Sequence, residues 1–263
     1  MSETEIGMVP DVLENQILMN MNDSMFINPS NEFLQTILTS LGQLDDVGTV
    51  QILIDSDDIT TIQRNFITAT TASELIENNE LELRTHSGGI FGTLTQTDDE
   101  IRCVSELDDT IVISESHTAT NELIDKINDK WSEGVEASLR TPPSSQIYDT
   151  MSQELGIGVA DDYRNLIEFV KSSDSITDID EVSAALLVGA KNNVLLYEIS
   201  KWGEDVGLAS KATFSRTKTE LESQGYIQTE KVPIDVGRPR LRLDLVPNVF
   251  EEDSVIEFAQ TVH

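Results

Sequence analysis

A chain of 263 residues is long enough for two ordinary domains, and its 48 acidic against 17 basic residues give a formal net charge of -31. No run approaches about 18 consecutive apolar residues and no basic segment precedes an apolar core at the start, which argues against a membrane span and a signal peptide. The single cysteine, Cys103, excludes an internal disulfide and a cysteine-based zinc site. We therefore expect a protein of the reduced cytoplasm, without a metal or a cofactor.

The acidic residues are spread along the chain, from Glu3 to Asp253, rather than collected in one tail. Their excess is far above the roughly 2 to 8 units of net charge usual for a small soluble domain. Such self-repulsion is tolerated where salt screens it, because the Debye length falls to about 3 Å at 1 M ionic strength. Together with only 8 lysines, the charge indicates a salt-rich cytoplasm, as in halophilic archaea. An ordinary acidic mesophilic protein is the alternative.

The first half of the chain alternates helical and strand patterns. Residues 1–29 have weak periodicity and are predicted to be a lead-in segment. A helix over 32–41, capped by Ser30 or Asn31, is followed by a strand over 50–54 and a helical stretch to residue 76. Four short strands and a last helix are predicted over 81–84, 91–95, 101–107, 110–114 and 118–131. This order predicts an α/β domain with a mainly central sheet over residues 30–142, which regulates or dimerises the protein.

Two helical patterns follow the boundary at Thr141–Ser145, over residues 146–155 and 161–171, before a polar break at 172–178. We expect a helical connector over residues 143–179. Its helices either join the domains, pair two subunits or pack against the sheet domain.

The last third of the chain has the element order of a winged helix-turn-helix domain, expected over residues 180–246 and followed by a tail or helix over 247–263. Helices over 182–190 and 194–206 are followed by a turn at 207–209 and by a helix that Ser210 caps and Gly225 closes. Two strands, 226–232 and 240–245, are joined by a stiff basic loop that contains Gly-Arg-Pro. The whole succession of elements is more specific than a helix-turn-helix alone.

The helix over 210–225 has the side chains of a recognition helix. Placing Phe214 and Leu221 inward turns small, hydroxyl and basic side chains outward. Small side chains let a helix approach the major groove, Arg reads guanine edges and Lys meets phosphates. The residues predicted to bind double-stranded DNA are Lys211, Thr213, Ser215, Arg216, Lys218 and Thr219 on the helix, with Arg238 and Arg240 in the wing.

The charge distribution supports that prediction. Residues 191–242 hold nine basic and seven acidic residues, a net charge of +2, so the rest of the chain carries -33. A DNA-facing surface needs this local contrast. The alternatives are a small helical domain whose Lys and Arg only solvate its surface, and a winged helix used for protein contacts.

Two segments resemble a known family. Residues 199–218, ISKWGEDVGLASKATFSRTK, and residues 236–240, VGRPR, are similar to haloarchaeal transcriptional regulators of the TbsP type. The resemblance covers most of the chain, although the N-terminal domain matches by order of elements more than by motif. It implies a two-domain, dimeric regulator of metabolic genes, and it gives neither an operator nor an effector.

A small-molecule effector is the further partner considered for the sheet domain. Ligands of α/β sheets gather at the carboxyl ends of strands, which here points to Asp55 and Ser56 after one strand and to Ser114 and His117 at the end of another.

No Ser-His-Asp, phosphate-loop or metal-ligand pattern occurs, so we do not expect an enzyme. The main hypothesis is a homodimeric, sequence-specific DNA-binding regulator. The alternatives are a metabolite-binding protein or enzyme that uses the sheet domain, and a protein-only interaction module of the transcription apparatus. Whether the protein represses or activates is left open.

Overall fold

The computed structural model describes residues 4–8, 24–42, 48–88, 92–97, 100–107, 110–116, 121–172, 179–235 and 237–246. The chain divides into two compact units, Met1–Pro143 and Ser144–His263. No helix in the described ranges is long and apolar enough to cross a lipid bilayer. The predicted tail over residues 247–263 lies outside the described residues.

A mixed eight-stranded sheet forms the first unit, in the order β1-β7-β6-β5-β2-β3-β4-β8. Strand β3 pairs in parallel with β2 on one side and with β4 on the other, and every other pairing in the sheet is antiparallel. The strands are β1 (Thr4–Met8), β2 (Met25–Ile27), β3 (Val50–Asp55), β4 (Leu81–His86), β5 (Thr93–Thr97), β6 (Glu100–Leu107), β7 (Thr110–Ser116) and β8 (Val135–Glu136).

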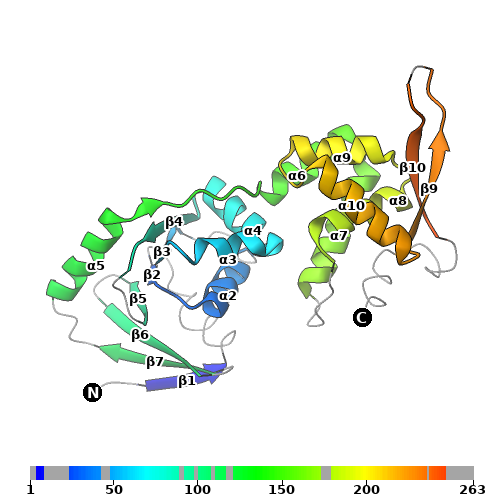
Figure 1. Ribbon diagram of the computed structural model, residues 1–263. Helices are drawn as coiled ribbons and strands as arrows, with labels where there is room; N and C mark the ends of the chain where they lie inside the picture. Colours follow the sequence, from blue (N-terminus) through cyan, green and yellow to red (C-terminus); the bar gives the residue numbers. More distant parts are fainter. Residues whose placement is uncertain are drawn as a thin grey trace. The chain divides into compact units, whose positions relative to one another are not determined.

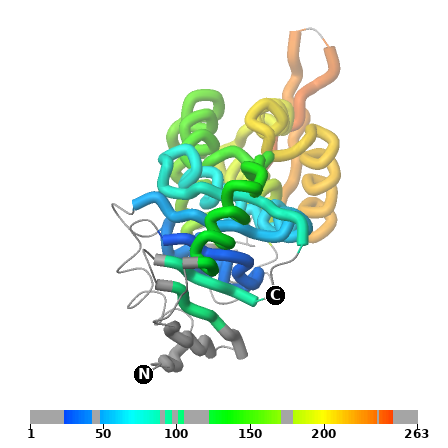
Figure 2. The backbone as a smooth tube through the Cα atoms, turned by 90° about the vertical axis from the view of Figure 1, so that its left-hand side faces the viewer, coloured from blue at the N-terminus to red at the C-terminus, as the bar shows by residue number. Residues whose placement is uncertain are grey.

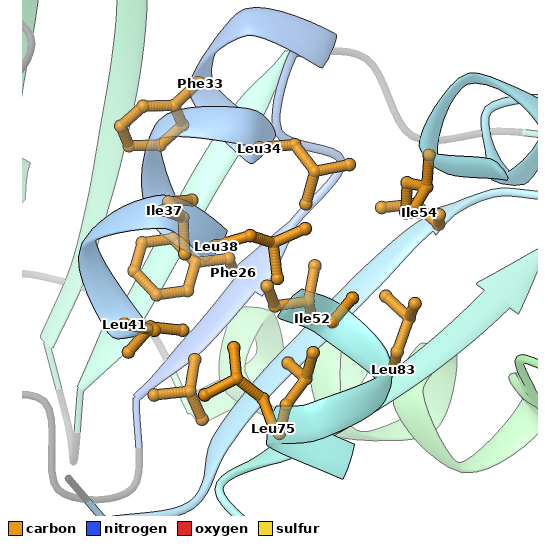
Figure 3. Packing of buried hydrophobic residues seen from close by; sticks show 14 of the residues in the cluster. Phe26, Phe33, Leu34, Ile37, Leu38, Leu41, Ile52, Ile54, Leu75 and Leu83 are labelled. Carbon is orange, nitrogen blue, oxygen red and sulfur yellow. The ribbon is translucent and has the colours of Figure 1, made fainter. Parts of the chain in front are cut away.

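Helices cover both faces of this sheet (Figure 1). On one face lie α2 (Asn31–Leu41), α3 (Ile59–Arg64) and α4 (Phe66–Glu77), and on the other lies α5 (Asn121–Glu133). The larger core lies under α2 and α4, where Phe26 of β2 meets Phe33 edge-on with ring centroids 6.1 Å apart (Figure 3). The cap predicted for α2 is confirmed, because Ser30 Oγ accepts the N–H of Phe33 at 3.1 Å.

Two strands of the sheet lie within residues 1–29, so the lead-in assigned to that segment is corrected. Strand β2 pairs with both β3 and β5, and the side chains of all three of its residues are buried. Its three apolar residues are too few to show a period of two, so the local pattern carries no strand signal. The sheet begins well before residue 30.

The helices assigned to a connector over 143–179 belong to the second unit. These are α6 (Ser144–Glu154) and α7 (Ile157–Ser172). Trp202 of the helix-turn-helix is fully buried and donates its Nε1–H to Thr150 Oγ1 of α6 at 3.0 Å. Asp162 of α7 accepts hydrogen bonds from Lys191 and Asn192 at 2.9 and 2.8 Å. These contacts join residues far apart in the sequence, so the spacing of residues along the chain does not predict them.

The winged helix-turn-helix is present with the predicted order of elements. Its helices α8, α9 and α10 pack around buried Leu186, Ile199 and Phe214, and the β9–β10 hairpin extends beyond them in both views (Figure 1 and Figure 2). The bounds are α8 (Glu181–Lys191), α9 (Leu196–Asp205), α10 (Lys211–Ser223), β9 (Ile227–Val232) and β10 (Arg240–Leu245). An α/β sheet domain is thus followed by helices and a winged helix-turn-helix.

Candidate nucleic-acid interface

Helix α10 begins and ends on local signals that also fix its orientation. Ser210 Oγ accepts the N–H of Thr213 at 3.1 Å, and Gly225, with a φ of 81°, ends the last turn, as predicted. Phe214 and Leu221 are buried, which turns the opposite face of the helix outward. The predicted inward and outward faces of α10 are therefore both confirmed.

A close approach of α9 and α10 depends on Gly203. A Cβ built at this position would overlap the ring edge of Phe214, whose side chain is fully buried. The missing side chain lets the aromatic ring of α10 lie directly against the backbone of α9. Gly203 therefore sets how the two helices of the helix-turn-helix cross.

The outward face of α10 carries Ser215, Arg216 and Thr219, all exposed, with exposed Ala212 beside them. Within the described ranges, Arg216 has neither an ion pair nor a hydrogen-bond partner for its guanidinium. The hydroxyl of Thr219 donates to the carbonyl oxygen of Ser215 at 2.9 Å. This face presents one free guanidinium among small and hydroxyl side chains.

The two lysines of α10 are held by carboxylates of the protein. Lys211 pairs with Glu204 of α9, which raises the pKa of Lys211 and lowers that of Glu204 through their hydrogen bond. Lys218 Nζ lies 2.7 Å from Glu222 Oε2, and only 13% of the lysine side chain is exposed. Thr213 is likewise engaged, since its hydroxyl lies 3.0 Å from that of Ser210.

Glu222 links the recognition helix to the wing, because its second oxygen accepts from Thr229 of β9 at 2.7 Å. Partial burial alone would raise the pKa of this carboxyl, but the hydrogen bonds from Lys218 and Thr229 outweigh it, and the pKa is lowered from 4.5. The folded form therefore favours the ionised carboxylate.

We expect Glu222→Gln to cost less than about 1 kcal/mol of unfolding free energy at pH 7, because the pair is partly exposed. A carboxyl whose pKa is lower in the folded than in the unfolded state stabilises the protein at pH values above its unfolded pKa. This stabilisation is lost as the pH falls through the folded pKa. The difference between the variant and the wild type should therefore shrink as the pH drops below 4.5. Urea unfolding followed by circular dichroism measures it, and a difference independent of pH would contradict it.

Among the residues that the structure describes, the wing presents a second guanidinium without a partner, that of Arg238. Arg238 and Pro239 are exposed in the β9–β10 loop, next to Gly237 at a φ of 115°. Val236, part of the predicted motif, lies outside the described residues. Arg240, at the start of β10, lies over the ring of Tyr197, with its Cζ 3.6 Å from the ring centroid. Arg242 pairs with Glu230, with 3.8 Å between Nη1 and Oε2.

The local charge of the C-terminal unit thus divides into two groups. Five of the nine basic residues in 191–242 are paired with carboxylates, namely Lys191, Lys201, Lys211, Lys218 and Arg242. In the part of the chain that the structure describes, the other four have no carboxylate within ion-pair distance, namely Arg216, Lys231, Arg238 and Arg240. Those four lie on α10 and on the β9–β10 hairpin, so the unpaired positive charge of residues 191–242 is concentrated on these two elements.

Tyr197 is not indicated by any sequence pattern, but the structure places it beside Arg240 of the wing hairpin. Tyr197 is 43% exposed, although it is one of the large apolar residues of the unit. Arg240 covers part of it. The sequence predicts α9 and β10 as separate elements. The helical pattern of α9 does not show which residue of β10 lies against a side chain in its first turn.

The structure describes three of the four candidate effector residues, and it separates Asp55 and Ser56 from Ser114. Asp55 ends β3 and Ser56 follows it, whereas Ser114 is on β7, with β2, β5 and β6 between the two strands. Strand β7 also runs opposite to β3, so the carboxyl ends of the two lie at opposite ends of the sheet. His117 lies outside the described residues. A single site cannot contain both Asp55 and Ser114, because four strand spacings of about 4.8 Å separate β3 from β7.

Around Asp55 the structure shows hydrogen bonds within the protein. Its carboxylate accepts the N–H groups of Asp57 and Gly88 at 3.1 and 3.3 Å, which with smaller contributions lowers its pKa. A cavity of about 330 Å³ opens elsewhere, beside β4 and β8, with Glu82, Arg84 and Glu136 in its wall. Within the described ranges, no group of three His, Cys, Asp or Glu side chains is placed to hold a metal ion.

Comparison with known proteins assigns both units. The family model for the N-terminal domain of TbsP-like transcriptional regulators matches residues 2–142, and the model for their C-terminal helix-turn-helix domain matches residues 143–263. A search of curated proteins finds no match.

One solved structure, described as that of "TrmBL2, an archaeal chromatin protein" with "a novel mode of DNA binding", is 14% identical over 52% of this chain. The match spans 54% of that protein, about half its length, and a TM-score of 0.34 does not establish a common fold. The two family models, by contrast, cover both structural units. The chain belongs to the TbsP-like transcriptional regulators, with a helix-turn-helix DNA-binding domain in its C-terminal unit.

Proposed function

We propose that the protein binds specific double-stranded promoter DNA through α10 in the major groove and through the wing on the flanking backbone or minor groove. The observation that carries the proposal is the pair of exposed, unpaired guanidiniums, Arg216 on α10 and Arg238 at the wing tip, on a chain of net charge -31. Arginine forms bidentate hydrogen bonds to guanine O6 and N7 in the major groove. In a narrow minor groove it is held by the enhanced negative potential.

The remaining predicted residues have graded roles in this proposal. Ser215 and Thr219 flank Arg216. The Ser215 hydroxyl donates to a phosphate or base edge, and the Thr219 hydroxyl must first leave the carbonyl oxygen of Ser215 to do the same. Lys211 and Lys218 contribute less than their charge suggests, because each ammonium must leave a carboxylate before it meets a phosphate. Thr213 acts mainly in the cap of α10.

We propose further that two chains bind one operator. One recognition helix contacts only a few base pairs, whereas two half-sites about one helical turn apart multiply the discrimination against the rest of a genome. Sedimentation of the full chain with an operator duplex tests this. A complex of one chain with one duplex would contradict it.

Footprinting tests the proposed function as a whole. The full-length chain at molar KCl should protect a discrete promoter segment whose sequence is recovered by selection from random duplexes. A metabolite-binding protein or a protein-only interaction module predicts no protected segment and no selected sequence.

The control of metabolic genes, which the family resemblance implies, is a finer proposal. Chromatin immunoprecipitation from cells grown on two carbon sources should recover promoters of metabolic genes with occupancy that differs between the two. Equal occupancy on both sources would contradict regulation by carbon supply.

We also propose that the protein works in a high-salt cytoplasm of the haloarchaeal kind. At about 0.1 M salt the Debye length is about 10 Å, so the net charge of -31 repels itself across the surface. We expect the thermal midpoint to fall by about 10 °C between 2 M and 0.1 M KCl, which corresponds to roughly 3 kcal/mol. Circular dichroism measures the midpoint, with equally osmotic sucrose as the control. Equal midpoints in the two salt concentrations would contradict the proposal.

A further inference from the structure

The contact between Arg240 and Tyr197 lies beside a backbone bridge that joins β10 to the start of α9. The N–H of Leu243 donates to the carbonyl oxygen of Val194 at 3.0 Å, and Leu195 pairs with Arg242 in an antiparallel bridge. Two residues onward from Leu195 and two residues back from Arg242 lie Tyr197 and Arg240. Helix α9 begins directly after Leu195 and carries Tyr197 in its first turn, whereas Arg240 begins β10. The bridge therefore holds the two elements together, and the Arg240 Cζ lies 3.6 Å from the centroid of the Tyr197 ring.

Tyr197 also lies near the beginning of α10. Glu204, which pairs with Lys211 at the first position of α10, lies seven residues after Tyr197 and therefore on the same face of α9. Tyr197 therefore contacts Arg240 at the base of the wing and lies on the face of α9 that meets the first residue of α10.

We propose that Tyr197 and Arg240 act as one stacked unit that binds a DNA phosphate between the recognition helix and the wing. The proposal rests on the proposed DNA-binding function. A guanidinium with one face on an aromatic ring keeps the N–H donors of its edge for phosphate oxygens. Arg240 has no carboxylate partner within the described ranges, so those donors are available. The ring restricts the guanidinium to one orientation, and the hydroxyl of Tyr197 is a second donor at the same place.

A double-mutant cycle on the full-length chain tests the pair. The probe is a labelled duplex selected from random sequence by the wild type, titrated by fluorescence anisotropy over a series of KCl concentrations. Tyr197→Leu and Arg240→Gln should each weaken binding about fivefold, and the double variant should be no weaker than the weaker single variant. Arg240→Gln should also reduce the slope of log K against log [KCl] by about 0.9, the value for one phosphate contact.

Tyr197→Phe separates the ring from the hydroxyl and should bind between the wild type and Tyr197→Leu. Because Tyr197 is partly exposed, all variants should melt like the wild type, which separates loss of contact from loss of fold. Multiplicative losses in the double variant, or an unchanged affinity for Tyr197→Leu, would overturn the pair. If Arg216→Gln weakens binding while these variants do not, only this inference fails. If the wild type selects no sequence, the proposed function fails and the pair with it.

Discussion

Arg216→Gln should reduce the affinity of the full-length chain for its selected operator by between about fivefold and 150-fold. One bidentate contact from arginine to guanine is worth about 1 to 3 kcal/mol of discrimination, which is the free-energy equivalent of that range. The guanidinium of Arg216 makes no ion pair within the described ranges and is exposed on the outward face of α10. Its removal therefore costs the folded protein little and the complex much.

The loss should be specific to one base pair. Duplexes that carry each of the four base pairs at the contacted position should differ in affinity for the wild type and become nearly equivalent for Arg216→Gln. Lys201→Gln is the matched control, because it removes the same charge from α9, where Lys201 pairs with Asp205 at 2.6 Å. If both variants lose the same affinity on every duplex, Arg216 contributes only charge.

Gly203→Ala should destabilise the C-terminal unit by about 1 to 3 kcal/mol, the usual cost of overpacking a core. The added methyl group overlaps the ring edge of Phe214, which is fully buried, so the ring must shift within the core. The better helix propensity of alanine, worth about 1 kcal/mol, offsets only part of that cost. Because the displaced ring belongs to α10, operator affinity should fall together with stability. Urea unfolding and anisotropy measure the two effects on one sample.

Gly158→Ala is the control for this prediction. Gly158 lies in the first turn of α7 in the same unit, and a Cβ there would meet only Asn192 Oδ1 at 3.7 Å, an ordinary contact. Its unfolding free energy should stay within about 0.5 kcal/mol of the wild type or rise slightly. Equal stability of the Gly203→Ala and Gly158→Ala variants would show that the close approach of α9 and α10 is not needed.

Local signals explain which elements the sequence predicts. Helix α10 was expected over residues 210–225 and spans Lys211–Ser223, since its cap, its buried Phe214 and its closing glycine all lie within the segment itself. Strands β2 and β8, with three and two residues, have no such signal. Their neighbours in the sheet determine them. Asn65, which caps α4 through the N–H of Thr68, likewise divides a stretch whose periodicity suggested one helix.

The contacts of the candidate site likewise fall into two groups, those that spacing within one helix predicts and those that join separate elements. Outward placement of Arg216 follows from helical spacing, and the pairing of Lys218 with Glu222 is the four-residue spacing of a helical ion pair. The pairing of Lys211 with Glu204 and the stacking of Arg240 on Tyr197 join separate elements. These two contacts depend on the turn between α9 and α10 and on the position of β10 beside the start of α9, which local sequence patterns do not predict. The separation of Asp55 from Ser114 depended on strand order, which spacing does not encode.

Methylation interference on the selected operator tests most directly whether α10 enters the major groove. Dimethyl sulfate modifies N7 of guanine in the major groove and N3 of adenine in the minor groove, the same edges that the two grooves present to a protein. We expect guanine methylation to block binding by the wild type, and interference at one guanine per half-site to disappear for Arg216→Gln while the others persist. Interference confined to adenine N3, or a guanine pattern unchanged by Arg216→Gln, would contradict recognition through α10.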